Sequence, residues 1–227
     1  TREAVCEILV AGEAVEAVKA SAAKAEKGLR EEYAGTDGNI TVQITEEGLA
    51  EADVLHPTSR EKVLFYLVQI PFGIQKMSGN IVGLVETSTN IGIVKLSDDE
   101  FFASSSVRSS VEAARDALSD KIQYLTEFLG GEYEIQGAYP AWEYRKDSPL
   151  RDKMVSVYEE MYGQKPEVVA IHAGLECGLF YKKIEGLDCV SLGPDMKDIH
   201  TSEERLSISS TKRVYEYLVE VLKRIKK

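Results

Sequence analysis

The sequence lacks the features that mark several common classes of protein. The formal net charge of the 227 residues is −11, which argues against nucleic acid and against an anionic membrane surface as partners, because neutralising phosphates takes clustered Lys and Arg. No apolar run approaches the roughly 18 residues of a membrane-spanning helix. The opening TREAVCEILV has no basic region followed by an apolar one, so we expect no signal peptide and a cytoplasmic location.

Cysteine is scarce and several motifs are missing. Cys6, Cys177 and Cys189 are an odd number for a disulfide framework and form no Cys-x-x-Cys pair, which favours reduced, buried thiols in a cytosolic protein. No phosphate loop, Gly-x-Ser-x-Gly elbow, His-Glu-x-x-His or zinc-finger spacing is present. Because the first residue is Thr rather than Met, we expect the chain to be part of something larger.

The first part of the chain has the periodicities of a mixed α/β domain. Apolar residues at intervals of three and four predict long helices over residues 12–34 and 110–129. Asn90 and Gly92 are typical of a strand kink or bulge. Strands are expected over 4–10, 39–47 and 132–138, and a helix over 59–70. Residues 81–110 are expected to form two or three strands with a turn at Ser97–Asp99. The order fits a two-layer, ferredoxin-like sandwich with helices on one face of a sheet.

A hinge is expected at Tyr139–Pro149, which carries two prolines and mixed charge. Beyond it the pattern predicts helices over 149–162, from Leu175 and over 209–225, strands over 167–173 and 188–193, and cap candidates at Ser209, Ser210 and Thr211. The two strands are of the buried type, which needs covering on both faces. This segment is therefore expected to be half of a larger domain whose other half is not in the chain.

His172 ends the predicted strand over 167–173, and ligand groups in α/β proteins cluster at strand ends. The next residue but one, Gly174, would let the backbone approach a ligand closely. The alternative is a hydrogen-bonded, partly buried histidine followed by a glycine that only turns the strand.

His200 follows a Gly-Pro loop that leaves the second predicted strand. A neutral imidazole is the commonest metal ligand. The alternative is a surface histidine beside a turn capped by Thr201 and Ser202. The third histidine, His56, precedes a helix and is expected to be solvated.

Two further side chains could carry chemistry. Arg108 lies among serines on an alternating strand, where it could grip a carboxylate with two hydrogen bonds or be a solvated charge. Cys177 begins a short helix and raises the possibility of a thiol hydrolase. The adjacent Glu176 opposes thiolate formation, so an inert thiol is favoured.

Several motifs, in this order and spacing, resemble the aminoacyl-histidine dipeptidases, the cytosolic Xaa-His branch of the two-metal peptidases. They are QGAYPAW at 136–142, IHAGLECGLF at 171–180 and VSLGPDMKDIHTSEERL at 190–206, with VGLVETSTNIGIV and SSVRSS matching earlier parts of the pattern. The resemblance implies that residues 1–137 are most of a ferredoxin-like lid domain that dimerises. It implies that residues 138–227 are the C-terminal part of a phosphorylase/hydrolase-like α/β catalytic domain.

The resemblance also implies roles for single residues. His200 matches the family's last metal ligand, and Arg108 matches the lid arginine that grips the substrate's terminal carboxylate. Gly174 matches a substrate contact, with His172 and Glu176 flanking it at the pocket. The implied substrate is a dipeptide, and the implied cofactors are two divalent ions, zinc above all, with Co²⁺ or Mn²⁺ as alternatives.

The family's other metal ligands and its general base precede the lid and are not in this sequence. We therefore expect the chain to be inactive by itself. The competing hypothesis is a non-enzymatic ferredoxin-like module that dimerises or binds a small molecule.

Overall fold

The computed structural model describes residues 3–169 and 175–225. The chain forms two compact units, Thr1–Val63 and Leu64–Lys227, called here the N-terminal and C-terminal units. Within the described ranges, no helix is both long enough and apolar enough to cross a membrane. The predicted domain boundary after residue 137 lies inside the C-terminal unit and stays a prediction.

The N-terminal unit is built around one long helix. A short 3-10 helix η1 (Gly12–Ala14) leads into α1 (Val15–Glu32), which confirms the helix predicted over 12–34. The strands predicted over 4–10 and 39–47 are wrong, because both segments lack regular structure. Side chains of α1 occupy backbone groups that a strand ladder would use: Arg30 Nε donates to the Ile40 carbonyl at 2.6 Å, and the Val42 N–H donates to Glu26 Oε2 at 2.8 Å.

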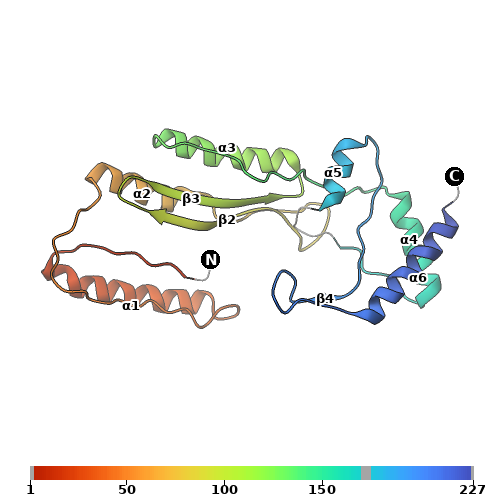
Figure 1. Ribbon diagram of the computed structural model, residues 1–227, viewed down its shortest axis with the longest axis horizontal. Coiled ribbons are helices and arrows are strands. Elements are labelled where there is room, and N and C mark those ends of the chain that lie inside the picture. The colour runs from red at the N-terminus through yellow and green to blue at the C-terminus, as the bar shows by residue number, and fades with distance from the viewer. Residues whose placement is uncertain (1–2, 170–174, 226–227) are drawn as a thin grey trace. The chain divides into compact units, whose positions relative to one another are not determined.

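The C-terminal unit contains a three-stranded antiparallel sheet. Its strands are β1 (Gly73–Met77), β2 (Val85–Leu96) and β3 (Phe101–Ser109), and Figure 1 shows β2 and β3 side by side. The predicted turn is confirmed, since the Ser97 N–H donates to the Glu100 carbonyl at 2.9 Å. The predicted bulge is confirmed as well, as a register shift between Ile91 and Ile93. Strand β1 was not expected from the sequence.

Helices α2 (Pro57–Gln69) and α3 (Glu112–Phe128) confirm the helices predicted over 59–70 and 110–129. Both contribute side chains to one hydrophobic cluster with β2 and β3, so both pack on the same face of the sheet, as expected for a two-layer arrangement. The buried members of the cluster are Tyr66, Ile70 and Ile122. Tyr66 meets Phe101 edge to face at 5.5 Å between ring centroids.

A second hydrophobic cluster joins α4 (Pro149–Tyr162) to α6 (Ile208–Arg224). Both helices were predicted within one residue of their ends. Val157 and Val221 are almost fully buried between them, and the Tyr217 hydroxyl donates to the Met154 carbonyl at 2.7 Å. Ser207, not one of the three predicted residues, caps α6 by accepting from the Ser210 N–H.

The remaining elements are α5 (Glu176–Lys183) and a small hairpin of β4 (Met196–Lys197) and β5 (Arg205–Leu206). The strands predicted over 132–138 and 188–193 are wrong, as is the described part of the strand predicted over 167–173. Their pattern is that of buried strands, but no neighbouring strand among the described residues pairs with them. A β pattern becomes a strand only where a partner supplies the ladder.

Candidate functional site

Arg108 lies near the end of β3 and is exposed. It is paired across the sheet with Ser88 on β2, and Ser106 precedes it on the same face of its own strand. The neighbours of Arg108 on both sides are therefore small hydroxyl side chains. An arginine so placed can bind a carboxylate through two parallel hydrogen bonds.

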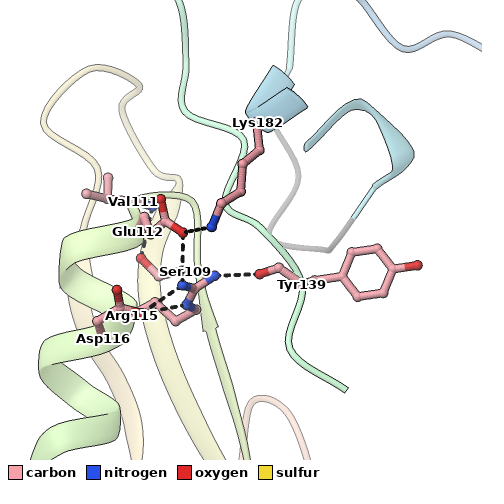
Figure 2. Close-up of polar contacts among 7 residues, drawn as sticks. All are labelled: Ser109, Val111, Glu112, Arg115, Asp116, Tyr139 and Lys182. Atoms are coloured by element: carbon pink, nitrogen blue, oxygen red, sulfur yellow. Dashed lines mark hydrogen bonds and ion pairs between the residues drawn. The ribbon is translucent and has the colours of Figure 1, made fainter. Parts of the chain in front are cut away.

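The segment after Arg108 is tied to distant parts of the C-terminal unit (Figure 2). Ser109 Oγ accepts from the Val111 N–H at 3.1 Å, just before α3 begins. On the first turn of α3, Glu112 Oε1 accepts from Lys182 Nζ of α5 at 2.8 Å and lies 3.2 Å from Arg115 Nη2. The hydrogen bond from Lys182, with its charge, lowers the pKa of Glu112, and Arg115 adds to the effect. The end of β3, the start of α3 and α5 therefore form one junction.

Arg115 is the most connected residue of this junction. Its Nη1 donates to the carbonyl of Tyr139, and its Nε and Nη2 contact Asp116 Oδ1 at 3.0 and 2.7 Å. Arg115 is only 20% exposed at its side chain. It therefore fixes the predicted hinge segment at Tyr139 against α3.

We expect Arg115→Ala to loosen that segment, because the Tyr139 carbonyl loses its donor. Cleavage by chymotrypsin after Trp142 or Tyr144 should accelerate roughly 5-fold, which corresponds to about 1 kcal/mol of local opening free energy. Arg60→Ala is the matched control, since the Arg60 side chain is exposed and forms an ion pair with its neighbour Glu61. Equal cleavage rates in the two variants would show that Arg115 does not hold the hinge.

Glu176 is the first residue of α5 and is exposed. The position of α5 is set by Gly178, which is buried against the segment before α4. A Cβ at Gly178 would lie 2.8 Å from the Pro140 carbonyl oxygen and 3.5 Å from Trp142 Cβ. Only glycine permits that approach, so Glu176 is held at a defined place beside the hinge. His172 and Gly174, also predicted at this site, lie outside the described residues.

His200 occupies the loop of the β4–β5 hairpin and is exposed. Its backbone N–H donates to Glu204 Oε2 at 2.8 Å. Asp198 Oδ2 accepts from Arg205 Nη2 at 2.6 Å, and the Asp198 carbonyl accepts from Thr201 Oγ1 at 2.7 Å. Thr201 Oγ1 in turn accepts from the Glu203 N–H at 3.2 Å, which confirms Thr201 as a turn cap. The loop around His200 is thus closed by its own side chains.

The hairpin has an uncommon backbone. Asp198 and His200 are the two non-glycine residues with positive φ among those described, at 54° and 65°. This left-handed conformation costs a non-glycine residue roughly 1–2 kcal/mol, so the surrounding bonds must maintain it. The hairpin base is anchored to α6, since the Asp195 N–H donates to the buried Ser210 Oγ at 2.9 Å. The hairpin that carries His200 is therefore joined to α6 and closed by its own hydrogen bonds.

A metal centre needs more ligands than this hairpin offers. Within residues 3–169 and 175–225, no three His, Cys, Asp or Glu side chains are grouped so as to hold a metal ion. The nearby carboxylates are already paired: Asp198 forms an ion pair with Arg205, and Glu204 accepts a hydrogen bond from the His200 N–H. The described residues alone do not fit a metal site, and His200 supplies one donor to such a site at most.

The sequence matches a protein-family model over most of its length. The model, described as peptidase family M20/M25/M40, matches residues 8–224. The chain belongs to peptidase family M20/M25/M40. The resemblance to aminoacyl-histidine dipeptidases and the α/β fold class are confirmed by this match together with two relatives.

The M20/M25/M40 chain is 30% identical over 224 residues to the cytosol non-specific dipeptidase of Escherichia coli (strain K12). The aligned region covers 99% of this chain and 46% of that protein. The crystal structure of aminoacylhistidine dipeptidase from Vibrio alginolyticus superposes with a TM-score of 0.73 at 29% identity, covering 90% of this chain and 44% of that one. Aminopeptidase PepT from Bacillus cereus shares the fold, with a TM-score of 0.55 at 17% identity, covering 72% of this chain and 44% of that one. The M20/M25/M40 chain thus spans about half the length of the relatives it matches.

Sequence reasoning missed the residues that join the elements around the candidate site. The spacing of Glu112 and Arg115 on one helix turn was visible, but their partner Lys182 is 70 positions away. Asp188, which binds the start of α4, also went unrecognised. Local pattern carries no sign of such distant pairs.

Proposed function

We propose that the protein containing this chain hydrolyses dipeptides, with Xaa-His dipeptides as the preferred class. Arg108 binds the substrate's terminal carboxylate, and Glu176, His172 and Gly174 line the substrate pocket. The observation that carries most weight is an exposed arginine flanked by serines at the end of β3, within a peptidase-family fold. Dipeptidase names among the relatives support the substrate class.

In the proposed enzyme His200 is a ligand to one of two divalent ions, with zinc the first choice and Co²⁺ or Mn²⁺ the alternatives. The hydrogen-bonded hairpin supports this role, because a ligand held by surrounding bonds loses little freedom on binding. The remaining ligands and the general base are proposed to come from parts of the enzyme outside this sequence. A homodimer formed through residues 1–137 and a cytoplasmic location complete the proposal.

The proposed grip of Arg108 has a direct test in the full-length protein. Two substrates are compared, Ala-His and its C-terminal amide, with wild-type enzyme and Arg108→Lys. Lysine keeps the charge but cannot make the two-pronged contact. The expected loss of kcat/KM on Ala-His is roughly 10–100-fold, since a hydrogen bond to a charged group contributes about 1.5–3 kcal/mol.

The amide substrate makes the test specific. The amide has no carboxylate for Arg108 to bind, so Arg108→Lys should change its hydrolysis by less than about 3-fold. The effects of the Arg108→Lys substitution and of substrate amidation on kcat/KM should therefore be strongly non-additive. Arg60→Lys, at an exposed arginine of α2, is the control and should leave both substrates unaffected. The same fold-loss on acid and amide would contradict carboxylate binding, and no hydrolysis of any dipeptide by the wild-type protein would favour the binding-module hypothesis.

A further inference from the structure

Cys177 and Cys189 lie against each other in the C-terminal unit although they are 12 positions apart in the sequence. The Cys189 thiol donates to the Cys177 carbonyl oxygen at 4.0 Å. The pKa of Cys189 is raised, first by burial and then by the charge and hydrogen bond of the Cys177 thiol. Both residues are free and half-buried, whereas Cys6 is exposed.

The position of each cysteine is fixed by its neighbour in the sequence. Cys177 precedes Gly178, whose close contact with the Pro140 carbonyl sets the place of α5. Cys189 follows Asp188, whose carboxylate accepts from Ser148 Oγ at 2.7 Å and from the Leu150 N–H at 2.9 Å. The backbone beside each cysteine is therefore held by its own contacts with the segment that precedes or begins α4.

Arg145 adds a third constraint on the chain between the cysteines. Its Nη1 donates to the carbonyls of Gly186 and Leu187 at 2.9 and 3.2 Å, just before Cys189. The segment between α5 and Cys189 is thus held by Arg145. A disulfide forms only where two cysteines are brought close together, and the 4.0 Å contact of the Cys189 thiol with the Cys177 carbonyl brings these two residues together.

We propose that Cys177 and Cys189 are a redox-active pair that closes to an intramolecular disulfide in the presence of a low-molecular-weight disulfide such as oxidised glutathione. One protein thiolate attacks a sulfur of the glutathione disulfide, whose S–S bond breaks and releases one glutathione thiolate. The second protein thiol gives up its proton and attacks the mixed disulfide, releasing the second glutathione. Two electrons pass from the protein thiols to the oxidant, and two glutathione thiols form.

The closed form would tie the start of α5, where Glu176 lies, to the segment that leads to the His200 hairpin. Formation of the disulfide depends only on the fold. The disulfide proposal can therefore be tested independently of the proposed peptidase activity. Oxidation is therefore followed by mass and unfolding rather than by turnover.

The experiment uses the full chain with Cys6→Ser, incubated with oxidised glutathione under native conditions. The expected product is lighter than the reduced chain by two hydrogen atoms and carries no glutathione. Trypsin cuts after Lys182 and Lys183, between the two cysteines, so a disulfide joins two peptides that reduction separates. The midpoint of thermal unfolding should rise by roughly 5–10 °C, because the bond restricts the unfolded chain.

Variants that leave one thiol separate closure from simple reactivity. In the Cys6→Ser background, Cys177→Ser and Cys189→Ser should each gain one glutathione and show no rise in the unfolding midpoint. If the chain with both cysteines instead carries two glutathiones and no linked peptides, the thiols do not face each other and the proposal is overturned. The same holds if both thiols react only after urea is added. Because the peptide map is made on the chain that keeps both cysteines, the result does not depend on the single variants folding.

Discussion

Replacement of His200 by asparagine in the full-length protein is expected to abolish dipeptide hydrolysis. Asparagine is the informative choice because it tolerates the left-handed φ of 65° found at His200. The backbone N–H that donates to Glu204 and the hairpin itself should be preserved. A loss of activity then reports the imidazole alone.

The expected loss is large because a direct ligand is removed. Losing a partner that merely orients a ligand already costs roughly 10–100-fold in metal affinity or activity, so His200→Asn should lower kcat/KM by at least that factor. Bound metal, measured after dialysis against metal-free buffer, should fall in parallel. Both readouts are needed, because a disturbed substrate pocket would lower activity and leave the metal content unchanged.

His56→Asn is the matched control. His56 is an exposed histidine whose Nδ1 accepts from the Thr58 N–H at 3.3 Å, a contact that asparagine can replace. It should keep full activity and metal content. If His200→Asn retains both within a few-fold, His200 is the surface histidine that the sequence also allowed, and the proposed metal role fails.

Helices were much easier to predict from this sequence than strands. The helix over 149–162 is confirmed to the residue, because Ser148 caps it, Pro149 starts it and Gly163 ends it in the left-handed conformation. These signals are local, and they act within a few residues of the helix end. A strand such as the one expected over 188–193 depends on a partner elsewhere in the chain, and its local pattern cannot reveal whether a partner is there.

The candidate site divides in the same way. Arg108 and His200 could be selected from the sequence because both follow recognisable strand and loop patterns, and the family resemblance matched their positions. The left-handed backbone at His200 could not be predicted, since it occurs in a loop closed by contacts of Glu204, Asp198 and Arg205 that the sequence does not reveal. The ion pair between Glu112 and Lys182 could not be predicted from the sequence either, because it joins elements that only the fold brings together.

Asp188→Ala is expected to destabilise the C-terminal unit strongly. The Asp188 carboxylate accepts from Ser148 Oγ and from the Leu150 N–H, and Ser148 Oγ in turn caps α4 by accepting from the Arg151 N–H at 3.1 Å. Ser148 is 3% exposed, so water cannot easily replace the lost partner. The expected loss in free energy of unfolding is roughly 1.5–3 kcal/mol, the sum of an orphaned buried hydroxyl and a weakened helix cap.

The same residue should make stability depend on pH in a defined direction. Burial acts to raise the pKa of Asp188, but the hydrogen bonds from Ser148 and Leu150 and the charges of Arg145 and Arg151 outweigh it and lower the pKa below its ordinary 3.8. The folded chain therefore binds the proton less readily than the unfolded chain. The stabilisation is present above the ordinary pKa and is lost as the pH falls through the lowered one.

Urea unfolding followed by circular dichroism between neutral pH and about pH 3 measures both effects, with the acid range chosen to reach the ordinary carboxyl pKa. Wild type should lose stability toward the acid end, and Asp188→Ala should start lower and lose less. Asp152→Ala is the control, because Asp152 lies on the first turn of the same helix with a side chain that is 76% exposed and only a 4.0 Å contact to Arg151. Hydrogen exchange at the Leu150 amide should accelerate in Asp188→Ala alone. Equal losses in the two variants would mean that the helix dipole, and not the Asp188 carboxylate, accounts for the effect.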